Sequence, residues 1–323
     1  MWLILAFLSA ALLGFYDSFK KKALQDNSVS TVLFLNTLFS TLIFAPFIIL
    51  SYTTNVLDGS IFHVASGGWE VHKWIILKSI IVLSSWTFGY LGMKHVPLTI
   101  YGPINATRPV LVLLGAILVY GERLNVWQWI GVALAVVSFF MPSRSGKKEG
   151  INFSHNRWIW FIVIGAVLGA ISGLYDKYLM NPEGLGLDRM IVQSWYNFYQ
   201  MIMMGIVLAL IHHTSISKDS KDTTAGTKKP TSFFRTIAAD LHSHGVLTII
   251  MISVFLSAAD FVYFYALSLP GAMISIVSMV RRGSVIVSFL FGAAFFHEKN
   301  LRSKTVDLAL VLLGMIFLWI GGH

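Results

Sequence analysis

A four-residue phrase occurs twice in this chain, as GFYD at residues 14–17 and as GLYD at residues 173–176. Each copy lies toward the end of an apolar stretch and is followed, in the same order, by a proline, an arginine and a glutamate with a basic neighbour. These residues are Pro97, Arg108 and Glu122 with Arg123 in the first half, and Pro270, Arg282 and Glu298 with Lys299 in the second. The chain is therefore one module written twice, a construction typical of secondary transporters that bind their substrate between two repeats.

The composition places the module in a membrane. Of the 323 residues, 56% are apolar and only 12% are charged, whereas about a quarter of the residues in an ordinary soluble domain are charged. A core for a chain of this size does not require so much apolar surface, so the surplus must face lipid. We therefore expect an all-α integral membrane protein.

Ten spans are predicted, because a bilayer core of about 30 Å requires roughly 20 apolar helical residues. With five spans in each half, the second copy must enter the membrane from the opposite side, so the repeat is inverted. The predicted repeats are 1–141 and 157–323, joined by a linker at 142–156, with a mobile polar loop at 212–245. The predicted spans are approximately 2–20, 31–51, 74–95, 98–120, 124–141, 158–180, 189–211, 246–267, 271–296 and 305–321.

The net charge of +9 does not indicate nucleic-acid binding, because the Lys and Arg residues form short clusters between apolar stretches. Most of the 24 basic residues follow odd-numbered spans, which predicts a cytoplasmic location for those loops and an external one for both termini. The chain contains no Cys, so it has neither disulfides nor thiolate metal sites. We expect no cofactor or metal.

Two matching segments resemble a known family. They are 108–124, which begins Arg-Pro-Val and ends Gly-Glu-Arg-Leu, and 281–299, which begins Arg-Arg-Gly-Ser-Val and ends Phe-His-Glu-Lys. With ten helices in two repeats, they resemble the EamA-like branch of the drug/metabolite transporter superfamily. The resemblance implies a carrier of small metabolites such as amino acids, sugars or drugs, and favours a bacterial inner membrane. Family members often have cytoplasmic termini, contrary to the charge distribution here, so the transport direction stays open.

Asp260 is the first candidate for a functional residue, since it lies well inside the predicted span 246–267. An ionised carboxylate at such a depth costs about 3 kcal/mol on insertion scales, so it faces a cavity or a partner. One interpretation is a site for a coupling proton or a substrate amine. The other is a structural ion pair with Arg281 or Arg282, and the same carboxylate can serve both roles in turn.

The repeated phrase supplies two Tyr-Asp pairs as gating candidates, Tyr16 with Asp17 and Tyr175 with Asp176. Inversion of the repeat places the two aspartates near opposite mouths of a central pathway. The alternative is that each is a helix-end charge at the level of the lipid headgroups.

Arg108 and Arg282 occupy matching positions and are candidates for holding a substrate carboxylate or phosphate, because a guanidinium donates through a planar fork. Neighbouring helical residues point about 100° apart, so we expect Arg282, and not Arg281, to face the cavity. A structural role is the alternative for each arginine. Further binding candidates, which offer aromatic faces or amide groups, are Asn105, Trp86, Tyr90, Tyr101, Tyr196, Asn197 and Tyr263.

Two other features predict structure and not chemistry. Glu122 and Glu298 follow spans and precede basic residues, so we expect them to pair locally and to satisfy helix ends. Gly165, Gly169 and Gly173 form small-xxx-small steps, which predict close helix contact within the bundle.

Together these features predict a secondary carrier that works by alternating access, with a cavity bordered by the first, third, fourth, sixth, eighth and ninth spans. Its expected partners are a small-molecule substrate and membrane lipid, and a homodimer is compatible with the sequence. The alternatives are a membrane enzyme or lipid-headgroup-handling protein, and a sensor with the loop 212–245 as its output. The sequence lacks the motifs of a hydrolase, a protease or an ATP-driven pump, so we do not expect an enzyme.

Overall fold

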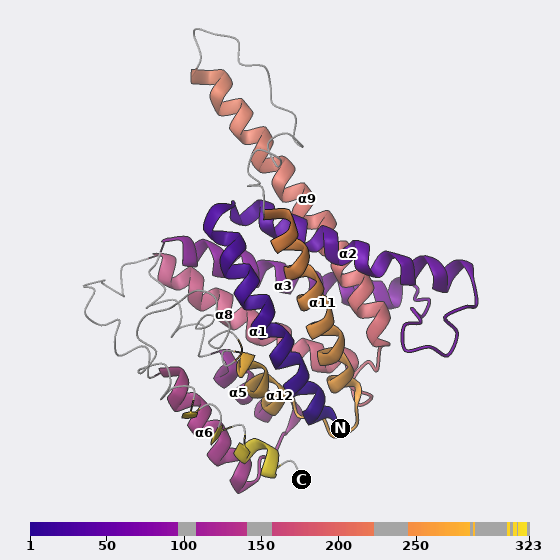
Figure 1. Ribbon diagram of the computed structural model, residues 1–323, viewed down its shortest axis with the longest axis vertical. Coiled ribbons are helices and arrows are strands. Elements are labelled where there is room, and N and C mark those ends of the chain that lie inside the picture. Colours follow the sequence, from indigo (N-terminus) through magenta and orange to yellow (C-terminus); the bar gives the residue numbers. More distant parts are fainter. Residues whose placement is uncertain are drawn as a thin grey trace.

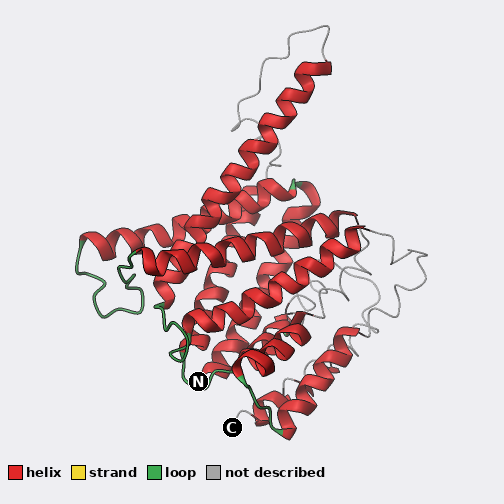
Figure 2. Cartoon of the chain, turned by 180° about the vertical axis from the view of Figure 1, so that it is seen from behind, coloured by secondary structure: helices red, strands yellow, loops and turns green. Residues whose placement is uncertain are grey.

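The computed structural model describes residues 1–95, 108–140, 157–222 and 245–284, together with 287, 309–310, 313–314 and 316–321. Within these ranges every regular element is a helix (Figures 1 and 2). The helices are α1 (Trp2–Asp26), α2 (Val29–Thr53), α3 (Trp69–His95), α5 (Arg108–Tyr120), α6 (Val126–Phe140), α8 (Arg157–Met180), α9 (Arg189–Asp222), α11 (Gly245–Ser268) and α12 (Ile274–Arg282). The expectation of an all-α protein is confirmed for the described chain.

Several helix boundaries differ from the predicted spans, and two of the differences have an identifiable cause. α9 continues to Asp222, eleven residues beyond the predicted end of its span, because no Gly or Pro occurs between that predicted end and Gly226 to stop the helix. The first part of the predicted loop 212–245 is therefore helical, and α9 projects well beyond the other helices (Figure 1). The remainder of that loop, 223–244, lies outside the described residues, as do the linker 142–156 and Glu298.

The other boundary is the start of α12, which begins at Ile274 and not at 271. Gly271 has a φ of 73°, a left-handed conformation that a glycine adopts without strain and that a helix does not contain. The short connection between α11 and α12 therefore includes a turn before the helix begins.

The bundle is built from long helix pairs. α1 packs along α11, α3 packs along α8, and α2 packs along α9. Buried serine hydrogen bonds join α1 to α11, α3 to α8 and α11 to α2. Ser9 Oγ donates to the Ala259 carbonyl at 2.8 Å, Ser85 Oγ donates to the Gly165 carbonyl at 2.8 Å, and Ser253 Oγ of α11 donates to Asn36 Oδ1 of α2 at 3.0 Å. Hydrogen bonds of this kind hold helices together where lipid supplies no hydrophobic driving force.

The α3–α8 contact depends on missing side chains. A Cβ atom built on Gly165 would lie 2.9 Å from the Gly89 backbone nitrogen and 3.2 Å from the Ser85 carbonyl oxygen. Because the obstacle is backbone, neither helix can yield locally. The predicted close contact of the glycine steps within the bundle is confirmed at this position.

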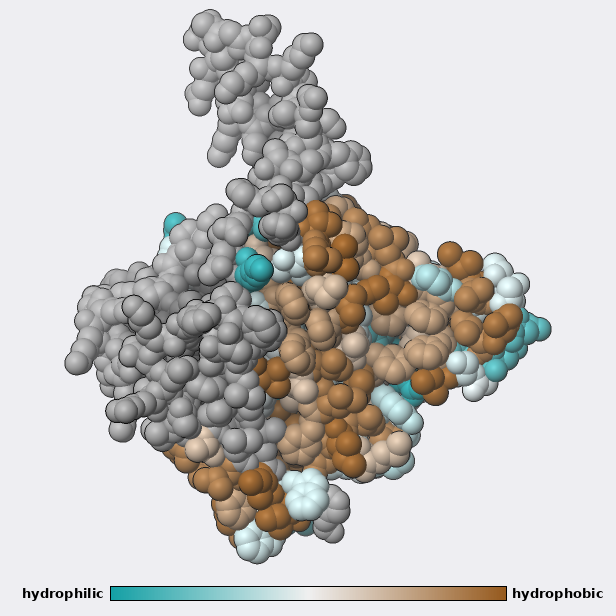
Figure 3. Space-filling model, viewed as in Figure 1, coloured by the Kyte–Doolittle hydropathy of each residue, from teal (hydrophilic) through white to brown (hydrophobic). Residues whose placement is uncertain are grey.

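The outer surface of the bundle is apolar. Figure 3 shows hydrophobic residues covering the visible face around α1, α2 and α11. Large apolar side chains there are exposed, among them Ile4, Leu8, Leu42 and Ile49. Four described helices are long and apolar enough to cross a membrane, at Trp2–Lys20, Val29–Thr53, Arg157–Met180 and Val246–Ser268. The chain is thus an integral membrane protein, since exposed apolar surface on this scale requires lipid.

Replacing Gly165 with alanine is expected to force α3 and α8 apart and to cost about 1–3 kcal/mol, as overpacking does. Gly173→Ala is the matched control on the same helix, because its new Cβ would meet only Val112 Cγ2, at 3.7 Å. Thermal unfolding of the purified protein in detergent should show a lower midpoint for Gly165→Ala than for Gly173→Ala. Equal midpoints for the two variants would show that the helix contact is not tight.

Candidate functional site: a charged cavity inside the bundle

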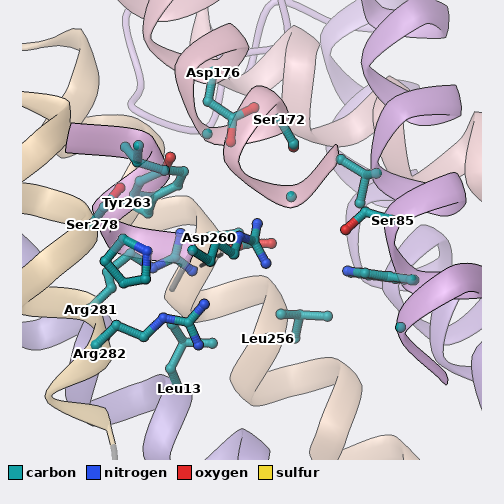
Figure 4. A pocket seen from close by; sticks show the side chains of 18 of the residues that line it. Leu13, Ser85, Ser172, Asp176, Leu256, Asp260, Tyr263, Ser278, Arg281 and Arg282 are labelled. Carbon is teal, nitrogen blue, oxygen red and sulfur yellow. Dashed lines mark hydrogen bonds and ion pairs between the residues drawn. The ribbon is translucent and has the colours of Figure 1, made fainter. Parts of the chain in front are cut away.

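A cavity of about 260 Å³ lies inside the bundle (Figure 4). Residues of α1, α3, α5, α8, α11 and α12 line it, and α9 contributes Tyr196. Apart from α9, these helices correspond to the six spans that the sequence analysis predicted around a central cavity. The cavity is therefore enclosed by helices from both halves of the chain.

Helical spacing explains why these residues meet. On α3 the lining positions recur every three or four residues, with one adjacent pair at 85 and 86, so they form a single face. On α8 the same spacing selects a stripe rich in small residues, and the missing side chains leave room for the cavity. The α3 positions are Lys78, Val82, Ser85, Trp86 and Gly89, and the α8 positions are Ile162, Gly165, Ala166, Gly169, Ser172, Gly173 and Asp176.

Charged side chains of both signs line this space. The described lining includes five basic residues, Lys20, Lys78, Arg108, Arg281 and Arg282, and three acidic residues, Asp17, Asp176 and Asp260. Arg108 lies against α8 where Gly169 leaves space: a Cβ on that glycine would be 2.6 Å from the guanidinium carbon. The positive groups thus outnumber the negative groups among the described lining residues.

Asp260 pairs with Arg281, whose Nη2 donates to the Asp260 carboxylate at 2.8 Å. The Arg281 guanidinium also lies 3.9 Å from the centroid of the Tyr263 ring, a cation–π contact. The structural ion pair predicted as one alternative for Asp260 is therefore present. The same pair lines the cavity, as the other alternative, a site for a proton or a substrate amine, requires. The expectation that only Arg282 faces the cavity is wrong, because Arg281 and Arg282 both line it (Figure 4).

The two aspartates of the repeated phrase line the same cavity. Asp17 accepts a hydrogen bond from Ser284 Oγ at 3.4 Å, and Asp176 forms an ion pair with Lys78. Tyr16 also lines the cavity, with Lys20 Nζ 5.2 Å from its ring centroid. The alternative of a helix-end charge at headgroup level is wrong for Asp176, which is buried and paired within the bundle.

The remaining candidates divide into three groups. Trp86, Tyr196 and Tyr263 line the cavity. Asn197 and Tyr175 are absent from its lining: Asn197 donates to the Gln193 carbonyl within α9 at 2.9 Å, and the Tyr175 hydroxyl donates to the Trp74 carbonyl at 3.2 Å. Tyr101, Asn105 and the side chain of Tyr90 lie outside the described part of the chain.

Lys78 is the cavity residue that sequence reasoning missed. It lies near the start of the predicted span 74–95, where basic residues commonly set membrane topology, yet it is buried and paired with Asp176. The signal was present in the helical spacing, since Lys78 shares the face of Trp86, eight residues later.

Outside the cavity, Glu122 joins the two halves of the chain. Its carboxylate accepts from Lys177 Nζ at 2.7 Å, from the Ile274 backbone nitrogen at 2.8 Å, and from the backbone nitrogen and hydroxyl of Ser275. The glutamate does satisfy a helix end, that of α12, where a negative charge is favoured by the free N–H groups and the helix dipole. The expectation that Glu122 pairs locally is wrong. Its charged partner is Lys177 of α8, and the backbone groups that donate to it belong to α12.

Glu122→Gln is expected to lower stability by about 3–5 kcal/mol, because it leaves Lys177 buried without a charged partner. The double variant Glu122→Gln/Lys177→Met removes both charges, while the glutamine oxygen can still accept from α12. Thermal unfolding should show that the double variant recovers much of the loss. A single variant as stable as the parent protein would contradict this account of Glu122.

Comparisons with known proteins agree with this architecture. Residues 1–144 match the EamA-like transporter family. A curated relative from Archaeoglobus fulgidus, described as an uncharacterized transporter, is 22% identical over 98% of this chain and 97% of its own length. A solved crystal structure of a protein with 14% identity matches the fold with a TM-score of 0.66, covering 99% of this chain and 96% of that one. The match over residues 1–144 agrees with the resemblance to the EamA-like transporters that the sequence predicted.

Proposed function

We propose that this protein is a secondary transporter that moves a small organic metabolite across the membrane by alternating access, driven by a proton or solute gradient. The observation that carries the proposal is the cavity of about 260 Å³ between the two halves, with charged and aromatic side chains on its walls. A buried polar cavity in a lipid-embedded bundle is costly, and such sites mark substrate or ion pathways. The inner membrane of a bacterium is the proposed location.

The packing of the helices supports ten spans in two inverted repeats. If the first repeat corresponds to the second, α1 corresponds to α8 and α3 to α11. The contact of α1 with α11 then corresponds to the contact of α8 with α3, and both contacts are present. In the same way α5 corresponds to α12. The contact of α5 with α8 then corresponds to the contact of α12 with α1, both contacts are present, and α5 and α12 also contact each other. An approximate twofold relation of this kind lets the repeats exchange conformations and open the site to either side.

The lining residues suggest a division of roles. Arg108 and Arg282 hold an anionic group of the substrate through their planar donors. Trp86, Tyr196 and Tyr263 provide flat faces for a ring or a hydroxylated body. Asp260 exchanges Arg281 for a proton or for a substrate amine, and so links transport to the gradient.

The proposal is tested by uptake of a mixed metabolite pool into proteoliposomes, with and without an imposed proton gradient, read by mass spectrometry. We expect accumulation of a few compounds that requires both the protein and the gradient. Exchange without accumulation would retain the carrier and remove the proton from the mechanism. If no compound shows protein-dependent flux, the transporter proposal is wrong.

Asp260→Asn is expected to abolish gradient-driven accumulation and largely to spare exchange, because the amide cannot bind and release a proton. Asp188→Asn is the control: Asp188 accepts from the Met190 and Ile191 backbone nitrogens at the start of α9, a role that asparagine also fills. Accumulation and exchange are measured on both variants in proteoliposomes. Unchanged accumulation by Asp260→Asn would remove this carboxylate from the coupling role.

A further inference from the structure

The ion pair between Lys78 and Asp176 joins the two halves of the chain across the cavity wall. Lys78 comes from α3 and Asp176 from α8, and both line the cavity. Their side chains are only 3% and 8% exposed, so little water screens their attraction. A second ion pair on the cavity, Asp260 with Arg281, joins α11 to α12 within the second half. The Lys78 pair differs from it by tying one half of the chain directly to the other.

The surroundings of Lys78 allow it to change partners. Its Nζ lies 4.8 Å from the centroid of the Tyr196 ring and 4.9 Å from that of Phe264. The faces of aromatic rings attract a cation, most strongly where water is excluded. The two rings stabilise the charged ammonium group while its carboxylate partner moves away. A second anion can therefore replace Asp176 without leaving the lysine charge uncompensated during the exchange.

The charge balance of the cavity favours an anion as that second partner. The described lining has five basic and three acidic side chains. An added anionic group brings the two signs closer to balance, whereas an added cation increases the excess of positive charge. The electrostatic field of the described lining residues therefore favours an anion over a cation.

We infer that Lys78 binds an anionic group, a carboxylate or a phosphate, of the transported metabolite, and that this group displaces Asp176. The inference rests on the proposed transport function and assigns its substrate to the organic anions. It also links binding to movement: the empty carrier is held by an ion pair between its halves, and the substrate anion breaks that pair. Lys78 is thus both a specificity-determining residue and part of the contact that binding releases.

Three four-carbon probes that differ only in their end groups test the choice of charge: succinate, putrescine and 1,4-butanediol. The thermal unfolding midpoint of the purified full-length protein in detergent is measured with each probe at equal ionic strength. We expect succinate to raise the midpoint, with a smaller effect at high salt, and the diamine and the diol to leave it unchanged. A rise with putrescine, or no rise with any probe, would overturn the inference.

Asp176→Asn distinguishes binding from a structural role. Removing the competing carboxylate leaves Lys78 charged between its two rings, so succinate should act at a concentration at least several-fold lower than in the parent protein. If Lys78 and Asp176 served structure alone, the succinate concentration required would be unchanged or higher, and the inference would fail.

The double variant Lys78→Met/Asp176→Leu removes the pair without leaving one charge alone, and it should abolish the succinate effect. Its matched control is Glu122→Gln/Lys177→Met, which removes a buried pair that does not line the cavity and should retain the effect. A double variant at 78 and 176 that still responds to succinate would contradict the inference.

Flux measurements separate this inference from the proposed function. If the parent protein carries metabolites from the pool but succinate does not compete with them, the carrier stands and the role of Lys78 is overturned. If no metabolite crosses the membrane, the carrier proposal itself fails, and with it the inference.

Discussion

The described bundle depends on the pairing of the charges that it buries. An ionised group that leaves water loses several kcal/mol of hydration, and it recovers that loss only from a close partner of opposite sign. The described part of the chain contains two such buried pairs, Lys78 with Asp176 and Lys177 with Glu122, and a partly buried pair, Arg281 with Asp260. The first two connect the two halves of the chain, so the same pairs that make the charges tolerable also hold the halves together.

Adjacent residues of α8 divide these roles. Asp176 faces the cavity and meets Lys78, while Lys177 turns away from it and meets Glu122 beside the start of α12. Two and three turns earlier on the cavity face, Gly169 admits the Arg108 side chain and Gly165 admits α3. One face of α8 therefore packs closely on α3, lines the cavity and presents Asp176 to it. A different face presents Lys177 to Glu122.

Ion pairs of this kind suit the proposed alternating-access transport, which requires a change of shape. Replacing a buried pair with well-packed apolar residues is often neutral or stabilising, so the pair contributes little that packing alone does not provide. An ion pair, unlike apolar packing, can exchange one of its partners. A substrate group or a proton can replace one charged side chain while the other remains in place. On this account, the cavity pairs are contacts that transport breaks and remakes, whereas the Glu122 cluster, with its additional backbone donors, is a more permanent joint.

Much of the site was predictable because the duplication marks it. The repeated phrase identified Asp17 and Asp176, and matching positions identified Arg108 and Arg282, all of which line the cavity. Partners were not predictable in the same way, because the side chain that meets Asp176 lies 98 residues away, and local spacing carries no information about contacts between distant helices. Lys78 resembled a topology residue near a helix start, and Glu122 has a basic neighbour that concealed its true partner, Lys177. Asn197 was selected for its amide within a span, yet that amide is satisfied by the backbone of its own helix.

The central claim is that one cavity serves both sides of the membrane, and the absence of native cysteines allows it to be tested directly. Ser172 lines the cavity from α8, so a Ser172→Cys variant carries a single thiol there. A membrane-impermeant thiol reagent is applied to one face at a time in vesicles of known orientation, and the rate of modification is measured. Alternating access predicts modification from either face. Modification from one face only, under every gradient and metabolite condition, would contradict it and would show a site that opens to a single side.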